Sequence, residues 1–499
     1  LIFRLYITSQ VAADVVIEVP GLGYLETVSV APNEITTFDL PNVQQLVVNF
    51  SEQVENKGIY IHSSEDITVY GINRMQYTTD AFLALPLDIL NTNYIAVSYP
   101  TIENTNNLSQ FAVVSPYDGN EIHIIPGAPT VTGNPAGSPV TVILNRGEVY
   151  QVQCYAGYDL TGSVIQSGLP VAVFSGHSCA NVPLNYGYCD HIVEQLPPTN
   201  TWGTTFITYP LEGRVNGDIW RIVSSQDNTA VTLNGESLAI LNFGDFYEFI
   251  LAVPSVIEAS NPIMVMQYST GNTYDPEIES NGDPFMMLIP PMEQFMSSYT
   301  FSTPANDFML NYVTITIPGN GTGSILLDGE PVDASVFEEI PGTGYSAAAL
   351  PVADGSHHIE TTDATKFGIY SYGFWNDDSY GYPGGFSLAY INEGGAPRIA
   401  LTASTTQLMR ENQVSNQPLT IEAAITDDTE PFLAGAWLYY RTVGQTGFSH
   451  LEMSNTTGSV WAAVIPGEGV QDPGLEFYIY ATDGQLTSFL PAVDLSLIH

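Results

Sequence analysis

Apolar and polar residues alternate with a two-residue period through most of this chain, and the alternation recurs in four related copies. Each copy opens with a stretch that runs into a turn glycine: Ile7–Gly21, Val113–Gly127, Ile222–Gly235 and Ile315–Gly329. A second alternating stretch follows in each copy: Ile61–Tyr70, Ile165–Phe174, Ile257–Met266 and Ile359–Tyr370. Such alternation is typical of strands that bury one face, so we expect four related β-units.

The spacing of equivalent positions gives the size of each unit. Val69, Val173, Val265 and Ile369 recur at intervals of about 100 residues, whereas solenoid repeats run roughly 20–50 residues. The sequence therefore predicts an all-β fold of tandem β-sandwich-like repeats: repeat 1 at 1–105, repeat 2 at 106–212, repeat 3 at 213–306 and repeat 4 at 307–395. The repeats can sit like beads or interlock by donating connecting strands, and both arrangements fit the periodicity.

A different pattern follows the turn-rich break at residues 394–397. The segment 398–499 contains four strand-like runs, with a tryptophan early in the series: Leu419–Ile425, Ala436–Arg441, Trp461–Ile465 and Phe477–Ala481. This spacing predicts an immunoglobulin-like or fibronectin type III-like sandwich.

Two local signatures recur inside the repeats. An acid precedes an apolar run that ends at proline, and we expect this acid to cap the preceding turn, with ligand binding as the alternative: Asp80, Asp190 and Asp283. An aromatic residue follows a glycine within three positions, and we expect this aromatic to enter the core: Tyr150, Tyr247 and Tyr345.

The charge balance excludes some partners. Ten Lys and Arg residues stand against 53 Asp and Glu residues, which gives a formal net charge of -43. Such a field repels phosphate backbones and anionic lipids, so we expect neither nucleic-acid binding nor binding to a membrane surface. The sequence contains no apolar run of about 18 residues, so we expect no membrane insertion.

Strand-like runs stand at both ends of the chain, and the first is not preceded by a signal peptide. We therefore expect a chain cut from, or matured out of, a longer protein. An exposed strand edge pairs readily with another chain. Leu1–Ile7 is accordingly the segment that we expect to be donated at a junction between subunits.

Longer motifs carry a family resemblance. They are Ile67–Gly71, Thr79–Pro86, Pro170–Pro183, Cys189–Pro198, Thr201–Gly203, Gly282–Pro291, Glu293–Phe295 and Ser379–Gly385. In order and content they resemble the amino-terminal domain of the IgGFc-binding protein family, over about 390 residues. The resemblance implies an extracellular, multidomain, adhesive or matrix-forming role. The animal namesake binds IgG, but these motifs contain no assigned Fc-contact residues. Phe285 follows Gly282-Asp283-Pro284 where self-cleaving relatives have histidine, so self-cleavage is not implied.

Two cysteines and two histidines form the most site-like cluster. His177 and Cys179 are two residues apart, as are Cys189 and His191, and such pairs on a strand face the same way. The extracellular context favours a Cys179–Cys189 disulfide, which would stabilise the fold by roughly 2–3 kcal/mol. Tetrahedral zinc bound by all four side chains, or free thiols, are the alternatives. Cys154 is expected to be a buried, small apolar residue.

Further candidates are weaker. The acidic turns Asn376–Asp378 and Asp427–Glu430 could bind Ca²⁺, although solvated turns are the preferred interpretation. The aromatic segment Tyr370–Phe386 is either a glycan-stacking platform or a packed plug between domains. Sequons that could be glycosylated begin at four asparagines: Asn49, Asn107, Asn320 and Asn455.

These features together predict a secreted, non-enzymatic structural or adhesive protein at the cell surface or outside the cell. The chain lacks the common hydrolase, metalloprotease and nucleotide-binding motifs, and we expect no catalytic residue and no cofactor other than calcium. Its partner is expected to be a second copy, in a filament built through β-strand contacts, or an extracellular protein or glycan bound by a monomeric stalk. A carbohydrate-active enzyme is a distant alternative, because 53 acids supply chance carboxylate pairs.

Overall fold

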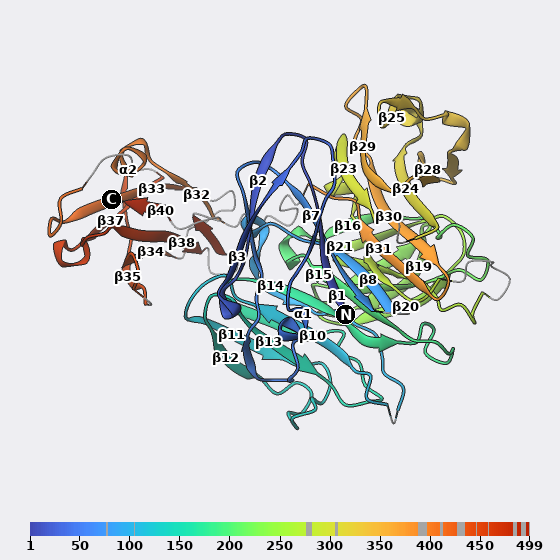
Figure 1. The fold of residues 1–499 in the computed structure, drawn as a ribbon, viewed down its shortest axis with the longest axis horizontal. Coiled ribbons are helices and arrows are strands. Elements are labelled where there is room, and N and C mark those ends of the chain that lie inside the picture. Colours follow the sequence, from blue (N-terminus) through green and yellow to red (C-terminus); the bar gives the residue numbers. More distant parts are fainter. Residues whose placement is uncertain are drawn as a thin grey trace. The chain divides into compact units, whose positions relative to one another are not determined.

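The computed structural model describes most of the 499 residues and divides them into two compact units. The residues that it describes are 1–75, 78–103, 105–275, 282–304, 308–387, 397–409, 413–426, 435–445, 447–457, 459–482, 487–490 and 496–498. One unit comprises Leu1–Leu85 and Asn91–Ile391, and the other comprises Pro86–Leu90 and Asn392–His499. Both units are built almost entirely from β-strands (Figure 1), which confirms the predicted fold class.

The four equivalent positions occupy the same place in four central strand pairs. Val69 pairs with Ile7, Val173 with Val113, Val265 with Ile222 and Ile369 with Ile315, always antiparallel. All eight side chains are buried. The two-residue alternation therefore identified the buried face of each pair and the relation between the repeats.

Repeat 2 consists of two sheets that share one long strand. The first half of β14 (Val164–Ala180) lies in a sheet of order β12-β11-β14-β9, and its second half lies in a sheet of order β13-β10-β14-β15. The other strands are β9 (Asn91–Ile95), β10 (Ser109–Val114), β11 (Asn120–Ile125), β12 (Val140–Leu144), β13 (Glu148–Gln153) and β15 (Asp190–Leu196).

Repeat 3 has the same plan around the long strand β21 (Ser255–Tyr268). Its sheets run β19-β18-β21-β16 and β20-β17-β21-β22. The other strands are β16 (Gly203–Thr208), β17 (Asp218–Ser224), β18 (Thr229–Leu233), β19 (Glu236–Leu241), β20 (Phe246–Leu251) and β22 (Met286–Leu288).

Repeats 1 and 4 divide the long strand into two separate strands. Repeat 1 has sheets β3-β2-β6 and β4-β1-β7-β8, and repeat 4 has sheets β26-β25-β29-β23 and β27-β28-β24-β30-β31. The strands of repeat 1 are β1 (Ile2–Thr8), β2 (Ala13–Val19), β3 (Tyr24–Val30), β4 (Thr36–Asp39), β5 (Val54–Asn56), β6 (Tyr60–Ser63), β7 (Thr68–Met75) and β8 (Thr78–Leu83). Those of repeat 4 are β23 (Ser298–Thr303), β24 (Leu310–Pro318), β25 (Ile325–Leu327), β26 (Glu330–Pro331), β27 (Glu338–Ile340), β28 (Tyr345–Val352), β29 (Gly355–Thr361), β30 (Gly368–Trp375) and β31 (Asp378–Pro383).

Among the described residues, helical structure is limited to short segments of three to six residues between strands. The two α-helical segments are α1 (Val43–Leu46) and α2 (Ala403–Leu408). The 3-10 turns are η1 (Pro20–Leu22), η2 (Leu87–Ile89), η3 (Thr199–Thr201), η4 (Met292–Gln294), η5 (Gly319–Ser324), η6 (Ala334–Val336) and η7 (Gly467–Gly469). Among the described residues, no helix is long and apolar enough to cross a membrane.

The repeats interlock through their connecting strands. β9 pairs with β14 of repeat 2, β16 pairs with β21 of repeat 3, and β23 pairs with β29 of repeat 4. The boundaries expected near residues 105, 212 and 306 assign each of these strands to the preceding repeat, although it pairs in the following one. Periodicity shows that a segment is a strand, but it does not show which sheet supplies the partner. Where to divide the chain into domains therefore stays a proposal.

The final strands of the four repeats form a closed ring. β8 packs against β15 and β31 (Figure 1), and β22 packs against the same two strands. Among the described strands, each of these four is paired with another strand on one side only, with β7, β14, β21 or β30. Four sheet edges therefore meet inside one compact unit, and Tyr70 and Tyr382 stack between repeats 1 and 4 with ring centroids 4.3 Å apart.

The expected donation of Leu1–Ile7 to another subunit is wrong for this structure. β1 lies inside its own sheet and pairs with β4 on one side and with β7 on the other. Leu5 and Ile7 belong to the buried core of repeat 1. Both edges of this strand are thus already paired within the chain.

The carboxyl-terminal unit contains a two-sheet sandwich, as the sequence predicts. One sheet runs β32-β33-β37-β36 and the other β35-β34-β38-β39, with β40 also paired to β38. The strands are β32 (Arg398–Leu401), β33 (Leu419–Thr426), β34 (Gly435–Thr442), β35 (Ser449–Glu452), β36 (Ser454–Thr457), β37 (Val460–Ile465), β38 (Leu475–Thr482), β39 (Thr487–Leu490) and β40 (Ser496–Ile498). Leu438, Ile421 and Phe477 lie in the core, whereas the early Trp437 is half-buried and packs on Tyr480.

A matched pair of substitutions in repeat 3 tests the buried central position. Replacing the fully buried Ile222 by alanine should lower the free energy of unfolding by about 2–5 kcal/mol, because it opens a cavity in the core. The same change at Ile240, whose side chain is 72% exposed, should alter it by less than about 0.5 kcal/mol. Urea unfolding of both variants measures the difference, and equal effects would contradict the assignment of the core face.

Candidate functional site

The predicted cysteine pair forms a disulfide. The sulfur atoms of Cys179 and Cys189 lie 1.99 Å apart, and the bond closes a short loop between β14 and β15. Cys154 is a buried free thiol, as expected, and burial raises its pKa to about 12. The bond places the two cysteines beside the histidines that the sequence grouped with them.

The alternative zinc site is wrong, because its four side chains are otherwise engaged. Each sulfur is bonded to the other. His177 accepts the Cys179 N–H at Nδ1 and contacts Thr101 Oγ1 through Nε2, both at 3.0 Å. His191 lies 3.0 Å from the His177 carbonyl through Nδ1 and 3.2 Å from Asn73 Nδ2 through Nε2. Within the described part of the chain, no three His, Cys, Asp or Glu side chains are placed to hold a metal ion.

The His177–Thr101 contact has the length of a base–nucleophile pair, but its surroundings do not suit catalysis. Both side chains are buried, and Nδ1 of His177 takes a backbone N–H where a catalytic histidine would donate to a carboxylate. Burial lowers the pKa of His177 to about 4, so the ring is neutral at neutral pH. The histidine thus satisfies polar groups inside the repeat.

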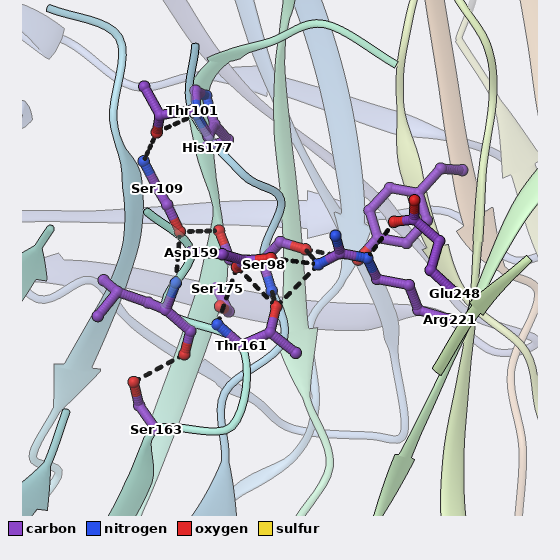
Figure 2. A network of polar contacts seen from close by, with 12 residues as sticks. Ser98, Thr101, Ser109, Asp159, Thr161, Ser163, Ser175, His177, Arg221 and Glu248 are labelled. Carbon is purple, nitrogen blue, oxygen red and sulfur yellow. Dashed lines mark hydrogen bonds and ion pairs between the residues drawn. The ribbon is translucent and has the colours of Figure 1, made fainter. Parts of the chain in front are cut away.

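A chain of hydroxyl groups leads from this histidine to a buried arginine (Figure 2). Thr101 Oγ1 accepts the Ser109 N–H at 3.1 Å, and Ser109 Oγ donates to Ser98 Oγ at 2.7 Å. The Ser98 carbonyl then accepts from Nη1 of Arg221 at 2.8 Å. The network crosses from repeat 2 into repeat 3, because Arg221 lies on β17.

Arg221 joins the two repeats through ion pairs and aromatic contacts. Its Nη1 lies 2.7 Å from Asp159 of repeat 2, and its Nε lies 2.7 Å from Glu248 on β20. The guanidinium also stands 4.6 Å from the Tyr99 ring centroid and 4.8 Å from that of Phe246. Figure 2 shows this side chain pointing away from β17 toward its partners in the neighbouring repeat. The other repeats have no arginine at the position equivalent to Arg221, so the sequence carries no recurring signal for this role.

A second polar cluster occupies the ring of final strands, where carboxylates accept backbone N–H groups. Asp80 on β8 accepts the Val193 N–H of β15 at 2.8 Å and the Met286 N–H of β22 at 3.3 Å. Glu194 on β15 accepts the Leu288 N–H of β22 at 3.1 Å. Side chains of one repeat therefore satisfy the open strand edges of its neighbours.

In other contacts across the ring, β8 supplies the donor, and acids of neighbouring repeats accept. Thr79 on β8 donates its N–H to Asp190 at 3.4 Å and its hydroxyl to Asp378 at 3.1 Å. The N–H of Asp283 donates to Ser379 Oγ at 3.2 Å. All these acids are buried. The carboxylates of Asp80 and Asp190 accept N–H groups of other repeats, so the expectation that they cap the preceding turn is wrong for both. The sequence showed their recurrence, but only the closed ring reveals what they face.

Burial changes the ionisation of these acids. Loss of solvation raises the pKa of Asp80, Asp190 and Glu194 well above the ordinary range. Nearby carboxylates add to the effect at Asp80 and Asp190. The pKa of Asp283 rises to about 7, first through burial and then through repulsion by Asp377 and Asp378, while Arg214 opposes the rise.

Arg214 lies beside a further buried acid. It donates through Nη2 to Ser269 Oγ at 2.8 Å and stands 5.0 Å from the Phe374 ring centroid. Burial raises the pKa of Asp218 to about 7, against the hydrogen bond from Leu211 N–H and the charge of Arg214. Two acids that titrate near neutrality therefore lie inside the four-repeat unit.

The other predicted sites have mixed outcomes. Asp378 of the acidic turn is buried in the ring, so it is not a solvated turn residue, and Asp427–Glu430 lies outside the described residues. The aromatic segment Tyr370–Phe386 forms β30 and β31, and its side chains are mostly buried, which excludes the glycan platform. Asn49, Asn320 and Asn455 of the sequons are exposed. Asn107 is half-buried and contacts Cys189 of the disulfide.

Thiol labelling tests the disulfide. Under denaturing, non-reducing conditions an alkylating reagent should modify Cys154 alone, and after reduction it should modify all three cysteines. The paired change Cys179→Ser with Cys189→Ser should cost roughly 2–3 kcal/mol of stability, since it removes a short closed loop. Cys154→Ser serves as the control for labelling. Three labels without reductant would contradict the bond.

Stability should fall as pH rises toward neutrality and above. An unfolded aspartate titrates near pH 4, whereas Asp218 and Asp283 titrate near 7 in the folded chain. Their protonation therefore favours the folded state fully below about pH 4, and this contribution is lost as pH rises through 7. Asp283→Asn should flatten the decline by roughly 2–4 kcal/mol between pH 5 and 8.

Urea unfolding at the two pH values measures this effect. The control Asp333→Asn replaces an exposed acid whose pKa is lowered by its Ser335 contact, and it should leave the decline unchanged. Wild-type stability that increases from pH 5 to 8 would contradict the role assigned to the buried acids.

The chain has similarities to known proteins in structure and in sequence. Two solved adhesion proteins align weakly: a tetra-tandem repeat from the extending region of a large adhesion protein (12% identity, 80% of this chain and 100% of that one) and the eight amino-terminal Ig domains of Down Syndrome Cell Adhesion Molecule (11% identity, 98% and 55%). Both have a TM-score of 0.14.

Sequence comparison is more specific. The IgGFc-binding protein of Homo sapiens is 31% identical over 349 residues, which cover 66% of this chain and 6% of that relative. This chain thus spans only a small part of the relative's length. The family model for IgGFc binding protein matches residues 80–373, which include the disulfide, Arg221 and most of the acid ring. The chain belongs to the IgGFc-binding protein family.

Proposed function

We propose that this chain is a non-enzymatic binding module of an extracellular or cell-surface adhesive protein. The observation that carries the proposal is the closed ring of β8, β15, β22 and β31, which fuses four repeats into one compact unit. Such a unit holds many exposed loops and strand edges in fixed positions, as a display scaffold must. Family membership supports a binding role.

The chemistry of the buried groups agrees with this proposal. His177, Arg221 and Asp80 each satisfy a polar group inside or between repeats, and all three are buried. Side chains used in this way are not presented to a substrate. The disulfide and the exposed sequon asparagines suit an oxidising, extracellular environment.

A binding experiment with the full chain tests the function. Biolayer interferometry against IgG Fc, a mucin glycoprotein and a panel of immobilised glycans should give saturable binding to at least one of them. The bound probe should have the same mass before and after incubation, because the proposal excludes turnover. Chemical conversion of a probe, or an absence of binding to every extracellular protein and glycan tested, would contradict the proposed function.

We further propose that copies of the chain associate into a filament, which requires contacts strong enough to outweigh the repulsion between like-charged copies. A net charge of -43 makes like chains repel, and ten basic residues can neutralise few acids. Association between copies must then rest on apolar or strand-pairing surfaces. It is therefore expected to strengthen when salt screens the repulsion, over a Debye length of about 30 Å at 0.01 M and 3 Å at 1 M.

Sedimentation velocity at these two salt concentrations measures the association. The sedimentation coefficient should stay constant or rise with salt, and larger species that dissolve at high salt would contradict a strand-paired filament. Deletion of Leu1–Ile7 serves as a separate check. It should unfold repeat 1 rather than merely weaken assembly, because β1 is an interior strand.

A further inference from the structure

Equivalent edge strands of the repeats differ in whether another strand covers them. Within each repeat the central strand pairs outward with β4, β13, β20 or β28. β5, which belongs to repeat 1, covers β13, and β27 covers β28. Among the strands that the described residues form, β20 ends its sheet, and so does the short polar β4. Repeat 3 therefore has an open edge at the position where repeats 2 and 4 have a covered one.

The covering strand accounts for the burial of the residues beneath it. Tyr150 on β13 and Tyr247 on β20 are equivalent, since each pairs with the central residue of its repeat, Val113 or Ile222. Tyr150 is 5% exposed and Tyr247 is 37% exposed. The next pair shows the same contrast, because Val149 is 4% exposed and Phe246 is 39% exposed. The sequence-based expectation that Tyr247 enters the core is thus wrong for a specific reason.

The joint between repeats 2 and 3 explains why β20 remains open. Where β5 approaches β13, the N–H of Gly58 donates to the carbonyl of Gly147 at 2.8 Å. Gly162 lies against Gly244 in the next joint, so closely that a Cβ on Gly162 would stand 2.6 Å from the Gly244 carbonyl. Gly162 is thus equivalent to Gly58, and the residues before it stand where β5 stands in the sequence of repeat 1, but they do not pair with β20.

The Arg221 network holds that preceding segment in place. Asp159 is bonded to Arg221, and the N–H of the buried Leu160 donates to Ser109 Oγ at 3.0 Å. The segment is therefore fixed against the hydroxyl chain of repeat 2 (Figure 2). The internal strand that would cover β20 is thereby unavailable.

The backbone of β20 presents hydrogen-bonding groups on its free side. In repeat 2 the outward groups of β13 bind the covering segment: Gln151 accepts the Glu52 N–H at 2.6 Å, and the Gln153 N–H donates to Ser51 Oγ at 2.9 Å. The pairing registers make Glu248 equivalent to Gln151 and Ile250 equivalent to Gln153. The N–H of Ile250 thus points toward the place that a covering strand would take.

The side chains along this edge are apolar and its charges are acidic. Phe246, Tyr247 and Ile250 are exposed on β20 itself. Glu248 lies on the same strand and pairs with Arg221, and Asp245 immediately precedes the strand. Arg221 brings one positive charge to two carboxylates, Asp159 and Glu248, so this cluster together with Asp245 keeps a net negative charge. A segment that pairs here must supply alternating apolar residues and positive charge. Another copy of this acidic chain, with net charge -43, does not meet the second requirement.

We propose that the β20 edge, Phe246–Leu251, binds an extended basic segment of a partner protein by antiparallel strand addition. The added strand would take the place that β5 occupies on β13 and β27 occupies on β28. Main-chain hydrogen bonds would supply affinity, and the apolar edge residues would select alternating side chains. This inference rests on the proposed binding function and identifies the surface that performs it.

The test uses the full chain and fluorescent peptides of about eight residues, the length of an ordinary strand. The probe alternates lysine with valine, and its counterpart alternates glutamate with valine. Fluorescence anisotropy should detect binding of the basic probe, and the acidic probe should bind at least about tenfold more weakly because of charge repulsion. A basic probe N-methylated at every residue should not bind, since the methyl groups block both of its hydrogen-bonding edges.

A pair of matched proline substitutions locates the binding. Ile250→Pro removes an outward N–H of β20 and should weaken binding of the basic probe by about tenfold. Thr37→Pro removes an outward N–H of the other open strand, β4, at the position equivalent to Glu248, and should leave binding unchanged. Because both N–H groups point away from the central strand, both variants should retain the fold, which circular dichroism checks.

The remaining outcomes each count against the proposal. Equal binding of both charged probes, full binding of the N-methylated probe, or equal effects of the two prolines would overturn it. Dimers of the chain that Ile250→Pro dissociates would assign the edge to a second copy instead. If extracellular proteins still bind the Ile250→Pro chain with unchanged affinity, the proposed function stands and the β20 assignment fails. If none binds either chain, the function itself fails.

Discussion

The structure depends on satisfying four strand edges that meet inside one compact unit. β8, β15, β22 and β31 each have one paired side, and the other side faces the ring. An unsatisfied buried N–H costs about 1–3 kcal/mol, so four bare edges could not be closed against one another without partners. Asp80 and Glu194 supply acceptors to strands of other repeats. The repeats are consequently coupled through hydrogen bonds that no single repeat could make.

The acidic composition supplies the carboxylate acceptors that the ring needs, but burying these carboxylates costs free energy of solvation. With ten basic residues in 499, carboxylates are the abundant acceptors, and most cannot find a cationic partner. A buried acid can remain neutral, and its pKa then rises, as at Asp283 and Asp218. The scarce arginines are placed where several acids converge, as Arg221 is between Asp159 and Glu248. The buried carboxylates of the interior and the negative charge of the surface therefore both follow from the excess of acidic over basic residues.

The sequence predicted what local periodicity can encode. The two-residue alternation identified Val69 and its equivalents, and the spacing of Cys179 and Cys189 together with the family context favoured the bond that the structure contains. It could not show that β9 pairs in repeat 2, because alternation specifies a buried face and not a partner strand. The recurring acid near the start of each final strand could be recognised in the sequence. Its hydrogen-bond partners lie in other repeats, so they could not be predicted before the ring was known. Arg221 is unique to repeat 3, so a search for recurring signals passes over it.

The functional interest of a repeat protein lies where equivalent positions differ. The joints of repeats 1–2 and 2–3 share a close glycine–glycine approach, and side chains larger than hydrogen would disturb both. They diverge just before that contact: β5 pairs with β13, whereas the residues around Asp159 turn toward Arg221. One arginine therefore has two consequences, since it binds repeat 2 to repeat 3 and withholds the segment that would cover β20. The same interaction that stabilises the scaffold leaves an apolar strand edge exposed, and stability and binding in this fold are consequently not independent properties.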